Sequence, residues 1–173
     1  MKFTKLGEIV NYSKDRIACE LLSSTNYVGV DNILPSKNGK KQSTYVPDTG
    51  NCTKYIKNDI LIANIRPYLK KIWFSNDFGG CSGDVSCLRI TNSNFDSKYI
   101  YYCLLQDAFF DYAMLGAKQG SRMPRLDKSQ ILSFRIVNIP IQTQTQIAAI
   151  LSSLDDKIEL NNRMASVLER MMR

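Results

Sequence analysis

Residues 143–173 constrain the fold of this chain more than any other stretch, because they follow one regular hydrophobic repeat. The repeat alternates steps of four and three residues, and its positions are Ile147, Leu151, Leu154, Ile158, Asn161, Ala165, Leu168 and Met172. A spacing of about 3.5 residues is typical of a coiled-coil seam, and neither Gly nor Pro interrupts it. The single polar member, Asn161, favours one register or one partner. Thr143 followed by Gln146 predicts a capping box at the helix start, just after Pro140.

A helix of about 29 residues would be about 43 Å long, more than a compact domain of this size needs internally. One interpretation is a long surface helix that folds back on its own domain. Such a helix normally shows a broader apolar stripe with a period of 3.6 residues. We therefore predict a helix for dimerisation or docking, with the seam positions as its contact residues.

The chain has 173 residues, which suggests one globular domain in addition to the helix. No apolar run is long enough to span a membrane and the first residues lack a signal-peptide core, so we expect a cytoplasmic protein without a membrane partner. The five cysteines form no CxxC pair, which indicates reduced thiols rather than disulfides or a zinc site. Histidine is absent, which removes the commonest metal ligand and the commonest general base.

The formal net charge is +7, and the excess is concentrated in two stretches. Residues 37–71 carry eight basic residues against Asp48 and Asp59, and residues 118–135 carry five against Asp127. Clusters of this kind favour a polyanion, most simply nucleic acid. The alternative is a surface whose basic charge serves solubility alone.

The first two thirds of the chain are dominated by strand patterns. Residues 27–34 and 43–46 predict two strands joined by a hairpin-like turn, with Asn38-Gly39 supplying positive φ angles. Residues 60–65 form a nearly continuous apolar run, which is typical of a buried strand. Residues 70–75 and 85–90 predict two further strands, and Gly79-Gly80 is interpreted as a turn between them.

Helical patterns follow. Ser97 is the predicted N-cap of a helix whose apolar face includes Ile100, Leu104 and Ala108. The aromatic residues of that segment are interpreted as core, although exposed aromatics also stack on bases. Asp127 with Gln130 predicts a second cap, and residues 134–139 predict the last strand. The pattern indicates an α+β domain with a mixed sheet over residues 1–141, followed by a long C-terminal coiled-coil helix over residues 142–173.

Motifs for catalysis are missing. There is no GxxxxGK or GxGxxG phosphate-binding loop, and the acidic residues show no spacing expected of a magnesium site. With no histidine to act as a base, the sequence indicates a binding protein with no catalytic residue and no metal.

Several motifs together resemble one family. GSRMPRL at residues 120–126 precedes a short helix and a strand that ends in IPI at 139–141. Two further motifs follow, QIA at 146–148 and LDDKIELNN at 154–162. Earlier in the chain, three stretches match the same pattern: LGEIV at 6–10, IRPYL at 65–69 and the strand within 81–88. Over nearly its whole length, the chain resembles the specificity (S) subunit of type I restriction–modification enzymes.

The resemblance implies a division of labour. The globular part would be a target-recognition domain that reads one half of a bipartite site in double-stranded DNA. The long helix would space two such domains and dock methyltransferase (M) subunits, with the restriction (R) subunit joining indirectly. S-adenosylmethionine and ATP would bind to those partner subunits, and no cofactor is expected here. A full family member contains two recognition domains and two helices, whereas this chain contains one of each. We therefore expect a two-fold homodimer with the helix as its spacer.

Basic and polar residues of the two charged stretches are the candidates for DNA contact, since they donate to phosphates or base edges. They are Lys37, Lys40, Lys41, Arg66, Lys70, Lys71, Lys118, Gln119, Ser121, Arg122 and Arg125. Two alternatives stay open: the 120–126 motif is structural, or Arg66 pairs with an acid inside the domain. The competing function is a protein-interaction module whose basic surface only confers solubility.

Overall fold

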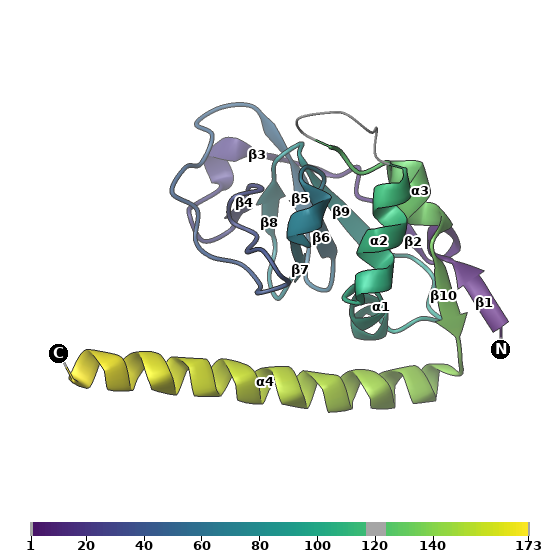
Figure 1. Cartoon of the computed structure of the whole chain (residues 1–173). Coiled ribbons are helices and arrows are strands. Elements are labelled where there is room, and N and C mark those ends of the chain that lie inside the picture. The colour runs from purple at the N-terminus through teal and green to yellow at the C-terminus, as the bar shows by residue number, and fades with distance from the viewer. Residues whose placement is uncertain (1, 117–123, 173) are drawn as a thin grey trace.

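The structure is a computed structural model that describes residues 2–116 and 124–172. It combines small sheets with helices, and the predicted α+β class with a long C-terminal helix is confirmed. Figure 1 shows the globular part above helix α4 (Ile141–Met171), which passes beneath it as a straight rod. The N-terminus lies near the start of this helix, and the C-terminus lies at its far end.

One antiparallel sheet has the order β2 (Val10–Tyr12), β9 (Val85–Ile90), β6 (Ile60–Ala63), β7 (Ile72–Phe74). All four residues of β6 are buried, as its apolar run predicted. Strand β9 covers the predicted residues 85–90. Its side chains pack with β6 against α1 (Ser97–Leu104) and α2 (Asp107–Leu115) in the main hydrophobic core.

A second sheet has the order β3 (Arg16–Ala18), β5 (Asn51–Tyr55), β8 (Gly79–Cys81), β4 (Tyr27–Val28), and the parallel β4–β8 pair makes it mixed. Gly79 and Gly80 lie inside β8, so their interpretation as a turn was wrong. They are glycines because of close packing: a Cβ on Gly79 would lie 2.0 Å from the carbonyl oxygen of Asn26, and one on Gly80 would lie 2.5 Å from Leu22. Strands β1 (Lys2–Lys5) and β10 (Arg135–Asn138) form a separate ribbon.

The predicted hairpin over residues 27–46 was also largely wrong. Strand β4 has two residues, residues 43–46 form no strand, and one bridge joins Ile33 to Lys40. The buried side chain of Asn32 accepts from the backbone N–H of Gly29 at 2.7 Å and donates to the carbonyl of Gln42 at 3.3 Å. These side-chain contacts hold a folded loop where a ladder of backbone hydrogen bonds was expected.

Two helices of the domain, α1 and α3 (Lys128–Ser133), begin at acidic caps. The N-cap of α1 is Asp96 rather than Ser97, because the Asp96 carboxylate accepts from the backbone N–H of Tyr99 at 2.8 Å. The predicted cap at Asp127 is confirmed at α3. The face expected to continue to Ala108 is broken between α1 and α2. Tyr99, Phe109 and Phe110 are buried, which supports the interpretation of the aromatic segment as core.

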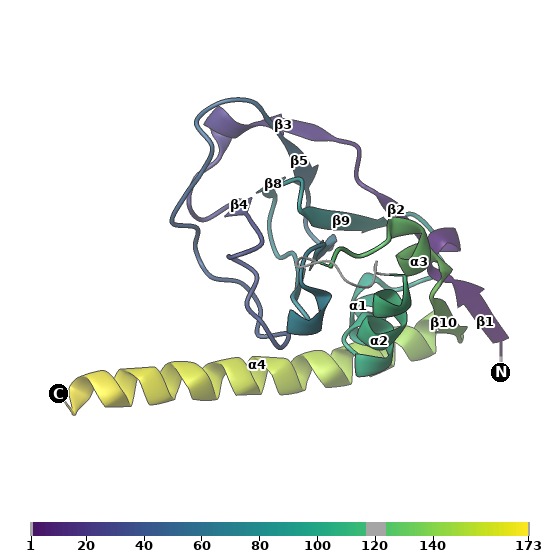
Figure 2. The ribbon, with the colours of Figure 1, turned by 45° about the horizontal axis from the view of Figure 1, so that its top comes forward.

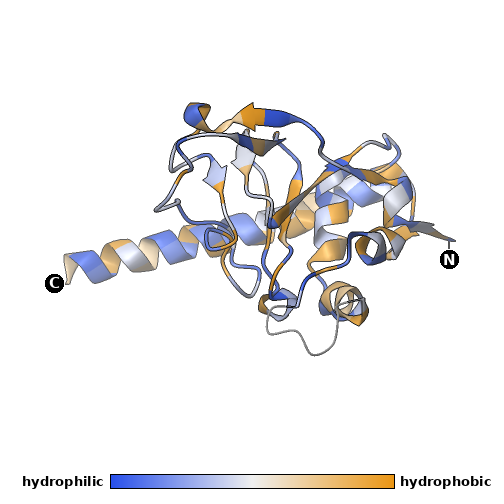
Figure 3. Ribbon diagram, turned by 90° about the horizontal axis from the view of Figure 1, so that it is seen from above, coloured by the Kyte–Doolittle hydropathy of each residue, from blue (hydrophilic) through white to orange (hydrophobic). Residues whose placement is uncertain are grey.

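Helix α4 begins at Ile141 behind Pro140, so the capping box predicted at Thr143 and Gln146 was wrong. Its first half packs on α1, with Gln144 and Ala148 buried. From Ser153 to Met172 every residue is exposed, and Figures 2 and 3 show the C-terminal end of the helix extending past the domain. Within residues 2–116 and 124–172, no helix combines the length and apolarity that a membrane span requires.

Candidate nucleic-acid interface

Two neighbouring segments carry an unusual backbone. Ser36, Lys37, Arg66 and Lys70 have φ angles of 56°, 64°, 53° and 48°, a left-handed conformation that non-glycine residues adopt rarely. The segments are joined by hydrogen bonds from the Ser36 N–H to the Leu69 carbonyl at 2.8 Å and from the Lys37 N–H to the Lys70 carbonyl at 3.1 Å. Backbone strain of this kind clusters at functional sites, where the surrounding structure maintains it.

The two lysines of these segments converge on one carboxylate. Asp107, the first residue of α2, accepts from Lys37 Nζ at 2.5 Å and from Lys70 Nζ at 2.9 Å through the same oxygen, Oδ1. These hydrogen bonds, that from Lys37 first, hold the pKa of the Asp107 carboxyl at about 2. Two cations far apart in the sequence are therefore held at one place on the surface.

Arg66 and Arg125 extend the same surface. Ile65 and Arg125 form an antiparallel bridge, and the Arg66 N–H donates to the Pro124 carbonyl at 3.0 Å. Arg125 pairs with Asp84 at 2.8 Å, while both of these side chains stay largely exposed. Arg66 is exposed, and the structure gives it no ion-pair partner among residues 2–116 and 124–172. We call Lys37, Arg66, Lys70 and Arg125 the basic corner.

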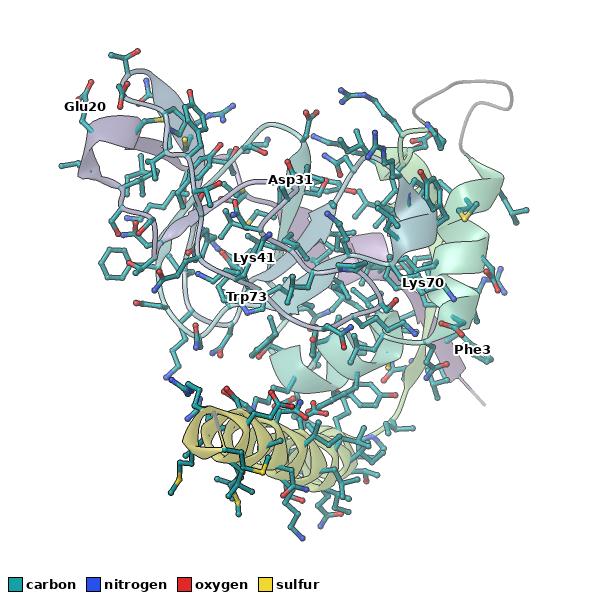
Figure 4. All side chains as sticks on the ribbon, turned by 60° about the vertical axis from the view of Figure 1, so that its left-hand side comes forward. Phe3, Glu20, Asp31, Lys41, Lys70 and Trp73 are labelled. Carbon is teal, nitrogen blue, oxygen red and sulfur yellow. The ribbon has the colours of Figure 1, made fainter. Side chains whose placement is uncertain are left out.

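Lys40 and Lys41 lie outside the basic corner, on a groove between the domain and α4 that Lys37 also lines. Lys40 donates to the Thr25 carbonyl at 2.6 Å, its ammonium group lies 4.8 Å from the centre of the Trp73 ring, and burial lowers its pKa. The groove has a volume of about 680 Å³, and α4 contributes Asp155 and Glu159 to its wall. Figure 4 shows Lys41 near Trp73 and Lys70 apart from both, beside α2. The groove sets three lysines against two acids, whereas the basic corner sets four cations against Asp84 and Asp107, so the basic corner is the more positive of the two surfaces and the better one for a polyanion.

The prediction that Lys71 contacts DNA was wrong, because this side chain is buried. Only 9% of the residue is exposed, and its ammonium group donates to the Val30 carbonyl at 2.8 Å inside the domain. It satisfies an interior carbonyl, so it does not lie on the surface where DNA would bind. Lys118, Gln119, Ser121 and Arg122 lie outside the described residues.

Sequence reasoning missed two members of this surface. Tyr68, 53% exposed in the 3₁₀ turn Pro67–Leu69, presents an aromatic ring next to Arg66. An exposed aromatic ring can stack on a base or a sugar. Asp107 was missed because the interruption between α1 and α2, which makes it the first residue of α2, is not marked by any periodic pattern in the sequence.

Helix α4 carries two apolar rows. The first half of the predicted seam is shielded by the domain, with Ile147 and Leu151 partly buried, whereas Leu154, Ile158, Leu168 and Met172 are 49–79% exposed. A second row, Leu160, Met164, Val167 and Met171, is 47–77% exposed. It repeats the seam positions from Asn161 to Met172 shifted by one residue, which rotates it by about 100° around the helix. Asp155, Glu159 and Asn162 face the domain, so the second row points away from it.

No group of three or more Cys, Asp or Glu side chains in the described parts of the chain has the arrangement of a metal site. Cys19 and Cys52 are free thiols 2.7 Å apart, and burial raises the pKa of Cys52 and of Cys81 to about 12. The thiols of Cys52 and Cys81 are therefore poor nucleophiles at neutral pH.

Comparison with known proteins gives a consistent result. The family described as Type I restriction modification DNA specificity domain matches residues 1–170. The Type I restriction enzyme EcoDI specificity subunit of Escherichia coli is 26% identical over 164 residues, which cover 87% of this chain and 36% of that protein. The crystal structure of the HsdS subunit from Thermoanaerobacter tengcongensis has a TM-score of 0.65 at 16% identity, covering 94% of this chain and 44% of that one. The S subunit structure from M. genitalium has a TM-score of 0.64 at 17% identity, covering 91% and 40%. The chain thus spans less than half the length of each of these relatives.

Proposed function

The chain belongs to the type I restriction modification DNA specificity domain family, and from this membership we propose that it recognises DNA for a type I restriction–modification system. In this proposal the globular domain reads one half of a bipartite site. The observation that carries it is the basic corner: four cations, three of them in a left-handed backbone conformation, on hydrogen-bonded segments next to an exposed tyrosine. Arginine and lysine side chains held in this way donate to phosphates and to guanine edges.

The proposed role of α4 is to hold two such domains apart. Its 31 residues correspond to about 46 Å, longer than one DNA turn of about 34–36 Å. Two chains that pair antiparallel through the seam would be related by a two-fold axis and would read an inverted repeat with an unread gap. The proportions support this, because the relatives are more than twice as long as the matched segment.

Docking of M subunits is assigned to the second row of α4. A two-stranded coiled coil covers only a narrow seam, so pairing would leave Leu160, Met164, Val167 and Met171 exposed on each chain. An uncovered apolar face of this length fits an amphipathic helix of another subunit. Methylation and cleavage then belong to the partners, which would bind S-adenosylmethionine and ATP, and this chain is non-catalytic.

Selection from a random pool tests the proposal. The chain is co-expressed with a cognate M subunit, and bound duplexes are selected at moderate salt. Enrichment of two inverted half-sites around a fixed gap is the expected result. Enrichment of a single ungapped half-site would show that the domain reads DNA but would exclude the role of the helix as the spacer of a homodimer. No enrichment, with the M subunit still bound, would leave the competing function, a protein-interaction module.

The exposed rows of α4 are the observation that favours this competing function. A salt titration separates the two, since phosphate contacts make log K fall steeply with log salt concentration and an apolar docking helix does not.

A further inference from the structure

Asp107 is the point on which the basic corner converges. One oxygen of its carboxylate accepts from two ammonium groups, at 2.5 Å from Lys37 and 2.9 Å from Lys70. The side chain of Asp107 is 63% exposed, whereas those of Lys37 and Lys70 are 25% and 31% exposed. A surface carboxylate thus fixes two long side chains that would otherwise sample many rotamers.

A second acid repeats the arrangement within the same surface. Arg125 donates to Asp84 at 2.8 Å, and both groups are exposed. The four cations of the basic corner therefore stand beside two carboxylates. A surface selected only for affinity toward phosphates would gain by lacking these acids, because each one repels the DNA backbone.

Resting on the proposed function, we propose that Asp107 is a specificity-determining residue: it positions Lys37 and Lys70 and restrains them from binding the phosphates of any duplex. Non-specific affinity comes from phosphate contacts that follow no fixed pattern, and a lysine must leave Asp107 to make one. A matched site presents acceptors where the held ammonium groups already lie. Specificity is a difference between two affinities, and Asp107 enlarges it by lowering the non-specific one.

A structural role for Asp107 predicts something else. As the first residue of α2, its negative charge also interacts favourably with the helix N-terminus. If that were its only role, its replacement would lower thermal stability and leave sequence preference unchanged. Asp111, one turn further along the same helix and exposed, provides a charge-matched control.

The test compares Asp107→Asn with Asp111→Asn in the full chain bound to its cognate M subunit. Affinities for the selected duplex and for a scrambled duplex are measured over a range of salt concentrations. We expect Asp107→Asn to bind the scrambled duplex several-fold more tightly, with a salt slope steeper by about one to two. The ratio of matched to scrambled affinity should fall, and adding Lys37→Ala and Lys70→Ala should abolish the gain. Asp111→Asn should shift both affinities alike.

The outcomes separate this inference from the proposed function. If the unaltered chain prefers one duplex but Asp107→Asn behaves like Asp111→Asn, the role of Asp107 is overturned and DNA recognition stands. If the unaltered chain binds no duplex at any salt concentration, both are overturned.

Discussion

The side-chain oxygen Oε1 of Gln144 accepts a hydrogen bond from the backbone N–H of Asp96 at 2.9 Å, and this contact fastens the start of α4 to the start of α1. The amide nitrogen of Gln144 donates to the Ile139 carbonyl at 2.8 Å and to the Asn94 carbonyl at 3.1 Å, and the residue is fully buried. Gln144 thereby fixes the start of the long helix, and contacts further along it, such as that of Tyr102 with Asp155 at 2.7 Å, share in holding its direction. In the proposed dimer that direction sets the separation of the two recognition domains.

Replacing Gln144 with Ala should lower the free energy of unfolding by about 2–4 kcal/mol, because three hydrogen bonds between this buried side chain and backbone groups are lost. The urea midpoint measures this. Gln146→Ala changes an exposed glutamine two residues further on and should stay within about 0.5 kcal/mol of the unaltered chain. Equal effects of the two substitutions would show that Gln144 does not anchor α4.

The two rows of α4 should be separable. Ile158→Asp places a charge in the exposed part of the seam and should abolish the dimer, because a buried unpaired charge is costly. Met164→Asp changes the second row and should keep the dimer but lose the M subunit. Light scattering gives the oligomeric state, and co-purification gives M binding. Loss of both properties in both variants would contradict the division of the helix into two faces.

Deleting one residue next to Ile158 tests the helix as a spacer. The deletion turns everything beyond it by about 100° and so breaks the seam in the middle. We expect the dimer to weaken and the preferred gap between half-sites to change. A deletion variant with the same dimer and the same preferred site would exclude the spacer role.

Arg66→Ala should weaken DNA binding. If Arg66 contacts a phosphate, the salt slope should fall by about 0.9 and sequence preference should persist. If it contacts a base, discrimination at one position should fall by about 1–3 kcal/mol. Arg135→Ala serves as the matched control, since Arg135 is exposed on β10, a strand that pairs with β1 and not with a segment of the basic corner. Identical affinities for both variants would remove Arg66 from the interface.

The contact of Asp107 with the two lysines predicts a pH response. Its pKa is lowered from 3.8 to about 2, so the contact is fully present above pH 3.8 and is lost as the pH falls through about 2. Titration of the carboxyl ¹³C resonance of Asp107 should therefore give a midpoint near this value. Lys70→Ala should raise the midpoint, whereas Lys41→Ala should leave it unchanged. A midpoint near 3.8 in the unaltered chain would show that the lysines are not held there.

Features that depend on neighbours in the sequence were predictable. The heptad period gave the long helix, the apolar run gave β6, the alternation gave β9, and Asp127 marked the start of α3. Each is a repeat or a cap read within a few residues, and such signals persist whatever the chain packs against. The motifs of the last third were sufficient to indicate the family.

Only the tertiary structure decided which polar residues reach the surface. Lys70 and Lys71 are adjacent, yet one binds a surface carboxylate 37 residues away and the other donates to an interior carbonyl 41 residues away. Gly79 looked like a turn residue and is required instead by the approach of another segment. The composition of residues 37–71 indicated a basic surface, but the groups that hold each lysine come from distant parts of the chain. Contacts of that range leave no period in the sequence, because they are fixed by how the sheets and helices pack.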